Sequence, residues 1–141
     1  MASKDLHNNL QGAIALATQA ITTDTTTVGA TIDTQGFEGV EFTATVGTVT
    51  DGDYEFQLFE GDESNMSDEA EVTAAGSLLG AAPNWTDSAN DELQSFGYRN
   101  DKRYLRLKVV STNTTTGGTM GATVQLGDPL HAPTTPPAEA S

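Results

Sequence analysis

Carboxylates crowd the stretch Asp62–Glu69, and carboxylate oxygens are ligands that Ca²⁺ prefers in proteins. Within this stretch, Asp62, Asp68 and Glu69 are the candidate calcium ligands. The stretch lacks the D-x-[DN]-x-[DN]-G spacing of a helix-flanked calcium loop, and Met66 stands where a ligand would be needed. A solvated charged loop therefore fits the stretch better than a cation site, and we expect neither a bound metal nor a cofactor.

Two carboxylates, Glu41 and Glu55, and the two histidines are the residues to weigh for hydrolytic chemistry. Glu41 and Glu55 lie on the polar faces of two neighbouring predicted strands, and carboxyl groups about 5–10 Å apart can hydrolyse a glycosidic bond. Aromatic residues that would bind a sugar are few, with one Trp, three Tyr and five Phe, and the core needs most of them. His7 and His131 lie in the terminal segments, and the chain has no Cys, His-x-x-x-His or Gly-x-Ser-x-Gly motif. We expect a protein that is not an enzyme.

Positive charge is concentrated in one segment, because five of the six basic residues lie between positions 99 and 108. In a chain this acidic, the cluster must face carboxylates, and two arrangements satisfy that requirement. It forms internal salt bridges that offset self-repulsion, or it forms a subunit contact in which Arg106 and Lys108 meet the acidic loop of a neighbour. The basic cluster consists of Arg99, Lys102, Arg103, Arg106 and Lys108.

Composition excludes several classes of partner. The chain has 141 residues, the usual size of one domain, and a net charge of −14 from 6 basic and 20 acidic residues. A field of that sign repels phosphate backbones and anionic membranes, so we expect no nucleic acid and no membrane partner. The absence of Cys removes disulfides and thiolate metal sites. No segment contains the roughly 20 apolar residues of a membrane span.

Alternating polarity predicts a mainly β protein. Apolar residues occupy every second position of 39–46 and of 54–59, which the Thr50–Asp53 turn separates, so this pair predicts a hairpin. Segments 104–110 and 120–126 alternate in the same way and predict a second hairpin. The segment 13–21 fits a strand or two turns of helix, and we favour the strand. Residues 22–29 are predicted as a turn-like connection, with short strands at 30–33 and 71–74.

Several short antiparallel strands, each with one apolar face, predict two sheets packed face to face. The fold class is therefore an all-β antiparallel sandwich, jelly-roll or immunoglobulin-like, comprising residues 12–127. Residues 1–11 form an N-terminal arm, and residues 128–141 form a Pro-rich C-terminal tail. The connection from Asp62 to Gln94 is long, and Trp85 within it is either a buried anchor of the loop or an exposed interface residue.

The chain resembles the small acidic decoration, or cement, proteins that cover the heads of tailed bacteriophages. The resemblance is one of overall texture and includes no catalytic signature. The segments that carry it span nearly the full length: Met1–Asn9, Phe37–Phe42, Tyr54–Asp62, Arg103–Val109 and Gly127–Pro133.

The resemblance implies a compact β-domain that binds the major capsid protein on the outer capsid surface, often as a homotrimer, after assembly in the host cytoplasm. Alternatives are a host- or glycan-binding head-fibre or adhesion module and a low-copy tail or neck component. No functional residue carries over from the family, so the contact candidates are physical: the two arms, the basic cluster and the acidic loop. Besides the basic cluster and Trp85, the candidates include Asp62, Glu63, Pro129 and His131.

Overall fold

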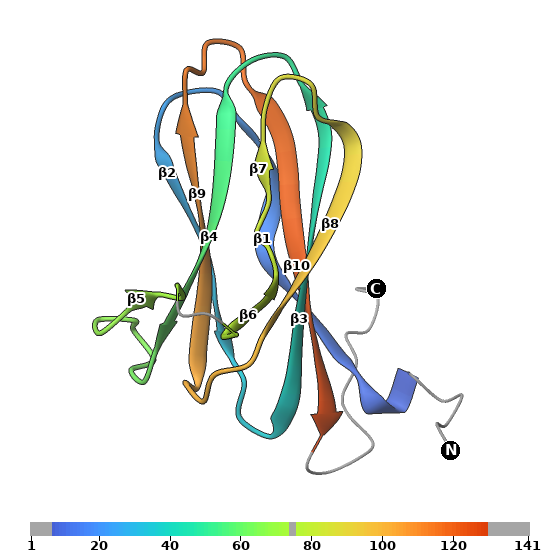
Figure 1. Cartoon of the computed structure of the whole chain (residues 1–141), viewed down its shortest axis with the longest axis vertical. Coiled ribbons are helices and arrows are strands. Elements are labelled where there is room, and N and C mark those ends of the chain that lie inside the picture. Colours follow the sequence, from blue (N-terminus) through green and yellow to red (C-terminus); the bar gives the residue numbers. More distant parts are fainter. Residues whose placement is uncertain (1–6, 74–75, 130–141) are drawn as a thin grey trace, which may run out of the picture.

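The computed structural model describes residues 7–73 and 76–129, and nearly all of them lie in strands or in the turns between strands (Figure 1). A single 3₁₀ turn, η1 (His7–Asn9), precedes the first strand. The strands are β1 (Gln11–Ile21), β2 (Thr26–Asp33), β3 (Phe37–Val49), β4 (Asp53–Gly61), β5 (Ala70–Glu71), β6 (Leu78–Gly80), β7 (Asn84–Trp85), β8 (Asn90–Tyr98), β9 (Tyr104–Thr112) and β10 (Gly118–Pro129).

These strands form two antiparallel sheets that pack face to face, as the sequence predicted. Sheet A has the order β1-β10-β3-β8-β6, and sheet B has the order β2-β9-β4-β5, with β7 also paired to β4. Along the chain, β1 to β4 alternate between the sheets, and so do β8 to β10. An immunoglobulin-like sandwich places several pairs of consecutive strands side by side in one sheet, whereas the alternation seen here is the order of a jelly roll.

Both predicted hairpins are wrong. The strand β3 pairs with β10 and β8, and the strand β4 pairs with β9, β5 and β7. The tight turn after β3, with Gly52 at a φ of +97°, carries the chain into the opposite sheet. Alternation reports that a strand has one buried face, but it does not report which strand lies beside it. Glu41 and Glu55 consequently belong to different sheets and share no outer face.

Several strand boundaries also differ from the prediction. The turn-like connection assigned to 22–29 is partly wrong, because β2 begins at Thr26, and β8 extends back to Asn90. Threonines of β2 and polar residues of β8 have exposed side chains, so these segments lack the apolar alternation that marks a strand. The strand predicted at 13–21 is confirmed as part of β1, and the short strand near 71–74 is the two-residue β5.

The core lies between the sheets and consists of the inward faces of the long strands. Phe42 stacks on Phe96 within sheet A at a centroid distance of 5.4 Å, and both rings are almost fully buried. From sheet B, alternate residues of β9 are fully buried, as the period of two predicted. The β9 and β10 contributions are Leu105, Leu107, Val109, Met120, Ala122, Val124 and Leu126.

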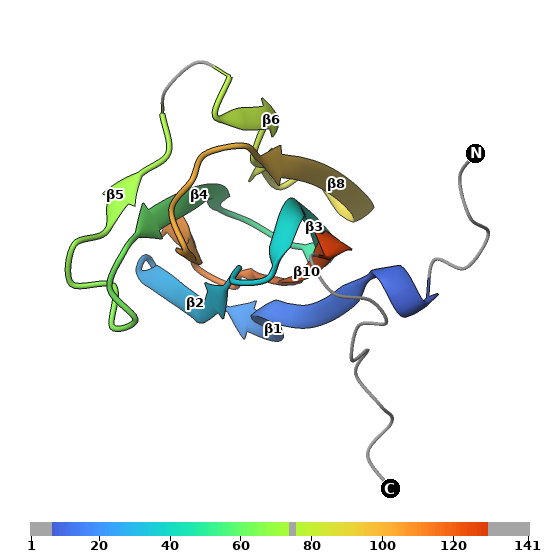
Figure 2. The same ribbon diagram turned by 90° about the horizontal axis from the view of Figure 1, so that it is seen from below.

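The two sheets meet where β1 lies beside β2, and Gly29 makes that approach possible (Figure 2). A Cβ atom at Gly29 would lie 2.3 Å from the backbone oxygen of Ala15 and 3.1 Å from that of Leu107. We expect Gly29→Ala to lower the free energy of unfolding by about 2 kcal/mol, because backbone atoms on two strands must move.

Urea denaturation of Gly29→Ala measures this cost, and Gly47→Ala is the matched control. Gly47 is also a strand glycine, but its added Cβ would meet only Thr119 O at 3.7 Å. The control should remain within about 0.5 kcal/mol of the unsubstituted protein. Equal effects of the two substitutions would contradict the close approach of β1 and β2.

Candidate interface surfaces

One end of the sandwich, called the arm end here, is where the described chain enters and leaves. Gln11 at the start of β1 pairs with Leu126 near the end of β10, and Pro129 pairs with Phe37 at the start of β3. The turn between β2 and β3 and the loop between β8 and β9 lie at the same end (Figure 1). Any residues that precede η1 or follow β10 therefore start from the same end of the molecule.

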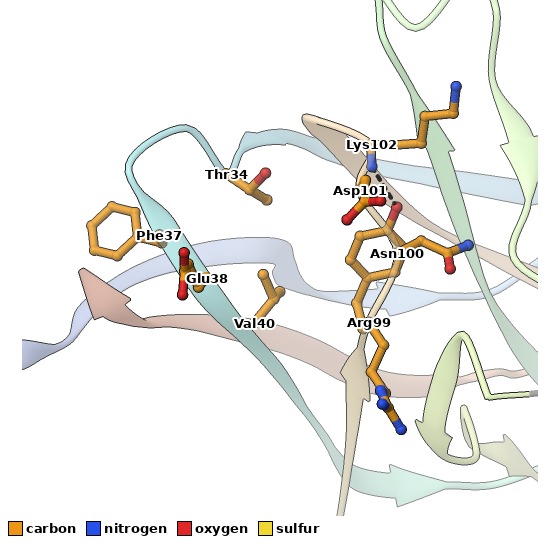
Figure 3. Close-up of a pocket in the computed structure, with 9 residues that line it drawn as sticks. Thr34, Phe37, Glu38, Val40, Arg99, Asn100, Asp101 and Lys102 are labelled. Carbon is orange, nitrogen blue, oxygen red and sulfur yellow. Dashed lines mark hydrogen bonds between the residues drawn. The ribbon is translucent and has the colours of Figure 1, made fainter. Parts of the chain in front are cut away.

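The arm end contains a pocket of about 320 Å³ (Figure 3). Thr34, Phe37, Glu38 and Val40 line it from the β2–β3 side, and residues 98–102 line it from the β8–β9 side. Phe37 and Val40 are partly buried and pack against the core, whereas most of the other lining groups are polar. The pocket thus combines a small apolar surface with hydrogen-bonding groups of both kinds.

Arg99 is the basic residue of this pocket that the fold leaves available. Its side chain is exposed, and it forms no salt bridge with any residue in 7–73 or 76–129. Its backbone N–H donates to Ser77 O, which fixes the main chain at the end of β8. A guanidinium on a fixed backbone is suited to bind a carboxylate from a partner.

A buried tyrosine holds the loop that carries Arg99. Tyr98 OH donates a hydrogen bond of 2.5 Å to Glu60 Oε2, at the end of β4, and accepts one from the N–H of Lys102. Asn100 Nδ2 donates to the same carboxylate. Burial of the phenol, followed by its bond to Glu60, raises the pKa of Tyr98. These bonds tie the loop, which follows sheet A, to sheet B; sequence reasoning missed them because no local pattern links Glu60 to Tyr98.

The other basic residues of the arm end form ion pairs within the chain. Lys102 Nζ lies 2.6 Å from Asp62 Oδ2. Arg103 donates two hydrogen bonds to Asp33, from Nε at 2.8 Å and from a terminal nitrogen at 2.9 Å. Both pairs are about half exposed, so their contribution to stability is small. Lys102 and Arg103 thus have internal partners, as the first of the two predicted arrangements requires.

Arg106 and Lys108 bind the acidic loop, but it is the loop of their own chain. Arg106 and Lys108 project from β9 on the outer face of sheet B, and Glu69 accepts from them at 2.6 Å and 2.5 Å. Lys108 Nζ also lies 4.3 Å from the centroid of the Phe59 ring. The bond from Lys108, and then that from Arg106, lowers the pKa of Glu69. Of the two arrangements that the sequence left open, Arg106 and Lys108 adopt the internal one in this chain.

The acidic loop 62–69 is an ordered turn in which the carboxylates of Asp62, Asp68 and Glu69 have protein partners. Asp68 accepts the backbone N–H groups of Asp62 and Glu63, and Met66 is buried beneath the turn. Asp62 pairs with Lys102 and Glu69 pairs with β9, so the three calcium candidates do not converge on one point. In the described part of the chain, no three His, Asp or Glu side chains are placed to hold a metal ion.

The remaining interface candidates differ in burial and in their position in the fold. Trp85 is buried, with its ring edge-to-face against Phe56 at a centroid distance of 5.3 Å, so it anchors the long loop. Glu63 is exposed in the acidic loop. Pro129 is the last residue of β10, next to Phe37 in the register. His131 lies outside the described residues.

At the opposite end of the sandwich, Asp51 joins two turns. Its carboxylate accepts the backbone N–H groups of Thr115, Thr116 and Gly117 at 2.9–3.1 Å. These bonds hold the pKa of Asp51 below its ordinary value of 3.8. They connect the β3–β4 turn to the β9–β10 turn. Sequence analysis assigned Asp51 no role, and its position before a turn glycine is the only signal that could have suggested one.

Acidification should unfold the sandwich through carboxylates that the folded state binds. The pKa values of Asp33, Asp51, Asp68 and Glu69 are lowered by their partners. Each group therefore stabilises the fold above its unfolded pKa, which is 3.8 for Asp and 4.5 for Glu, and this stability is lost as pH falls through the folded value. We expect the melting temperature to fall between about pH 5 and about pH 2.

Circular dichroism melts across this range provide the measurement. Asp51→Asn should have a lower melting temperature at neutral pH than the unsubstituted protein. Its melting temperature should also fall less on acidification, because the variant no longer has the contribution of the ionised Asp51 to lose. A melting temperature that stays constant or rises below pH 3.8 would contradict the role assigned to these carboxylates.

The fold and its surfaces define a jelly-roll β-sandwich with internal ion pairs and a polar pocket at the end where the described chain begins and ends. No model of a known protein family matches the chain, and no curated protein matches it either. Within the described residues, no helix has the length and apolarity needed to cross a membrane.

Proposed function

We propose that this chain is a non-enzymatic structural protein of a tailed-bacteriophage virion, which binds the outer capsid surface and stabilises contacts between major capsid protein subunits. The observation that carries the proposal is the arm end, where β1 begins, β10 ends and the pocket with Arg99 opens. A domain with both arms at one end can lie on a surface while its arms reach neighbouring subunits. Many such weak contacts, repeated over a lattice, add by multivalency.

The jelly roll supports the proposal by analogy, because viral capsid domains use this architecture. Lectin domains use it as well, so a glycan-binding head-fibre or adhesion module is the second candidate. The pocket favours that candidate to the extent that Phe37 and Tyr98 lie among polar groups that could bind hydroxyls. A tail or neck component is the third, and it differs from decoration in copy number.

Copy number in purified particles tests the proposal. Quantitative mass spectrometry should find a stoichiometry near one chain per major capsid protein subunit. A few copies per particle would indicate a tail, neck or fibre component, and absence from particles would refute any virion role.

Binding to assembled shells tests the surface. The purified chain should co-sediment with shells, and Arg99→Ala should weaken binding by about tenfold because it removes a guanidinium that has no salt-bridge partner among the described residues. Arg103→Ala is the matched control, since its charge is already paired with Asp33. Saturable glycan binding without shell binding would favour the adhesion candidate instead.

A further inference from the structure

The outer face of sheet A is a broad surface that the described structure leaves open. Residues on β1, β10, β3 and β8 point away from the core there, and one cross-strand row runs Ile14, Thr123, Thr43, Ser95. Leu93 projects from the next row beside Thr45. The name "threonine face" is used for the set Ile14, Thr43, Thr45, Leu93, Ser95 and Thr123.

Apolar side chains are exposed on this face. Ile14 is 58% exposed and Leu93 is 65% exposed, and Leu79 on β6 is 47% exposed in the row that contains Gly97. Of the four large hydrophobic residues that are exposed among the described residues, only Val28 lies on sheet B. Ile14 and Leu93 stand on opposite sides of the face, with the threonines of β10 and β3 between them. Three of the four exposed apolar side chains thus belong to one sheet.

Charge is nearly absent from the same surface, although the chain has a net charge of −14. None of the six residues of the threonine face is ionisable, and β1 contains no acidic or basic residue. The outward carboxylates of sheet A, Glu41 and Asp91, stand at its margins, one row beyond Thr43 and one beyond Leu93. A second acidic molecule is therefore repelled less at this face than it would be if the net charge of the chain were spread evenly over its surface.

The threonine face also has a hollow and a projection. A hollow of about 280 Å³ lies over Gly12 and Ala13, beside Ile14, Thr123 and Gln125. Leu93 projects on the β8 side of the same face, across two intervening strands. For any two points on a face, one two-fold axis in the plane of the face exchanges them. An axis midway between Leu93 and the hollow therefore places Leu93 of each copy over the hollow of the other.

We propose that the threonine face binds a second copy of this chain in a two-fold, face-to-face dimer. The distribution of charge favours this partner: the face that carries the least charge is the one on which two chains of −14 meet with the least repulsion. The contact is isologous, so it closes as a dimer and is not the trimer that the resemblance implies. The proposal does not depend on the proposed capsid function.

The size of the face sets the expected strength. Four strands about 4.8 Å apart and about seven residues long cover roughly 450 Å² in projection, which is below the ~800 Å² per partner of a standard interface. We therefore expect weak association, with a Kd between about 1 µM and about 1 mM. The dimer would be populated where the protein is concentrated.

Sedimentation equilibrium of the full chain, from about 10 µM to about 1 mM, tests the proposal. Thr123→Glu places a carboxylate at the centre of the face and should weaken dimerisation by at least about tenfold. Thr31→Glu is the matched control, because Thr31 is an exposed strand threonine of sheet B. Leu93→Ser is a second variant that adds no charge and should also weaken the dimer. Circular dichroism melts confirm that each variant is folded.

Salt distinguishes this dimer from association through ion pairs. Because two acidic chains meet at an uncharged face, raising the ionic strength should strengthen dimerisation by screening their repulsion. A contact between the basic cluster and a neighbour's acidic loop would weaken instead. A protein that stays monomeric throughout, a trimer, or a dimer that Thr123→Glu and Thr31→Glu affect equally would overturn the proposal.

Discussion

Replacing Trp85 with alanine should lower the free energy of unfolding by about 3–5 kcal/mol, the cost of truncating a large buried aromatic ring. Only 6% of Trp85 is exposed, and its ring packs edge-to-face on Phe56. The two-residue strand β7 holds the loop against β4, and the adjacent Pro83 O accepts a hydrogen bond from Phe56 N. Without the indole ring, β4 loses the packing of Trp85 on Phe56 and the segment that covers this part of sheet B.

Urea denaturation followed by far-ultraviolet circular dichroism is the suitable measurement, because Trp85 is the only tryptophan and its fluorescence disappears with it. Leu93→Ala is the control: it also truncates a large apolar side chain, but an exposed one, and should change stability by no more than about 0.5 kcal/mol. If Trp85→Ala left stability intact while altering association, Trp85 would be an interface residue and not an anchor.

The strands of the core could be predicted from the sequence because burial on one face imposes a period of two. Leu105, Leu107 and Val109 are buried in the predicted alternation, and Phe42 and Phe56 face the core from opposite sheets. Which strands pair could not be predicted, since pairing depends on contacts between segments far apart in the chain. The tight turns at Gly52 and Gly117 fit a hairpin and a crossing between sheets equally well.

The surfaces likewise include features that the sequence reveals and features that only the fold reveals. The basic cluster was visible as a run of charges, but the partners of Arg103 and Arg106 lie 70 and 37 residues away and only the fold brings them together. The threonine face was hidden for the opposite reason. Thr43, Thr45 and Thr123 are ordinary strand residues in the sequence, and they form one uncharged surface only after β3 and β10 have paired.

Replacing Glu69 with glutamine should lower the free energy of unfolding by about 3 kcal/mol, at the low end for breaking a buried ion pair, because the site remains partly open to water. Glu69 is the shared acceptor of Arg106 and Lys108, and the three side chains are only 18–22% exposed. Arg106 Nε is buried and has no hydrogen-bond partner in the described structure. Without the carboxylate, two largely buried cations would face each other across a neutral amide.

Chemical denaturation of three variants separates this network from general charge effects. Glu63→Gln removes the same charge from an exposed position in the same loop and should not destabilise the protein. Adding Lys108→Met to Glu69→Gln removes one of the two stranded cations and should recover part of the lost stability, as coupled neighbours do. If Glu69→Gln behaved like Glu63→Gln in the isolated chain, the internal pairs would be dispensable, and Arg106 and Lys108 would again be available for a neighbour's acidic loop.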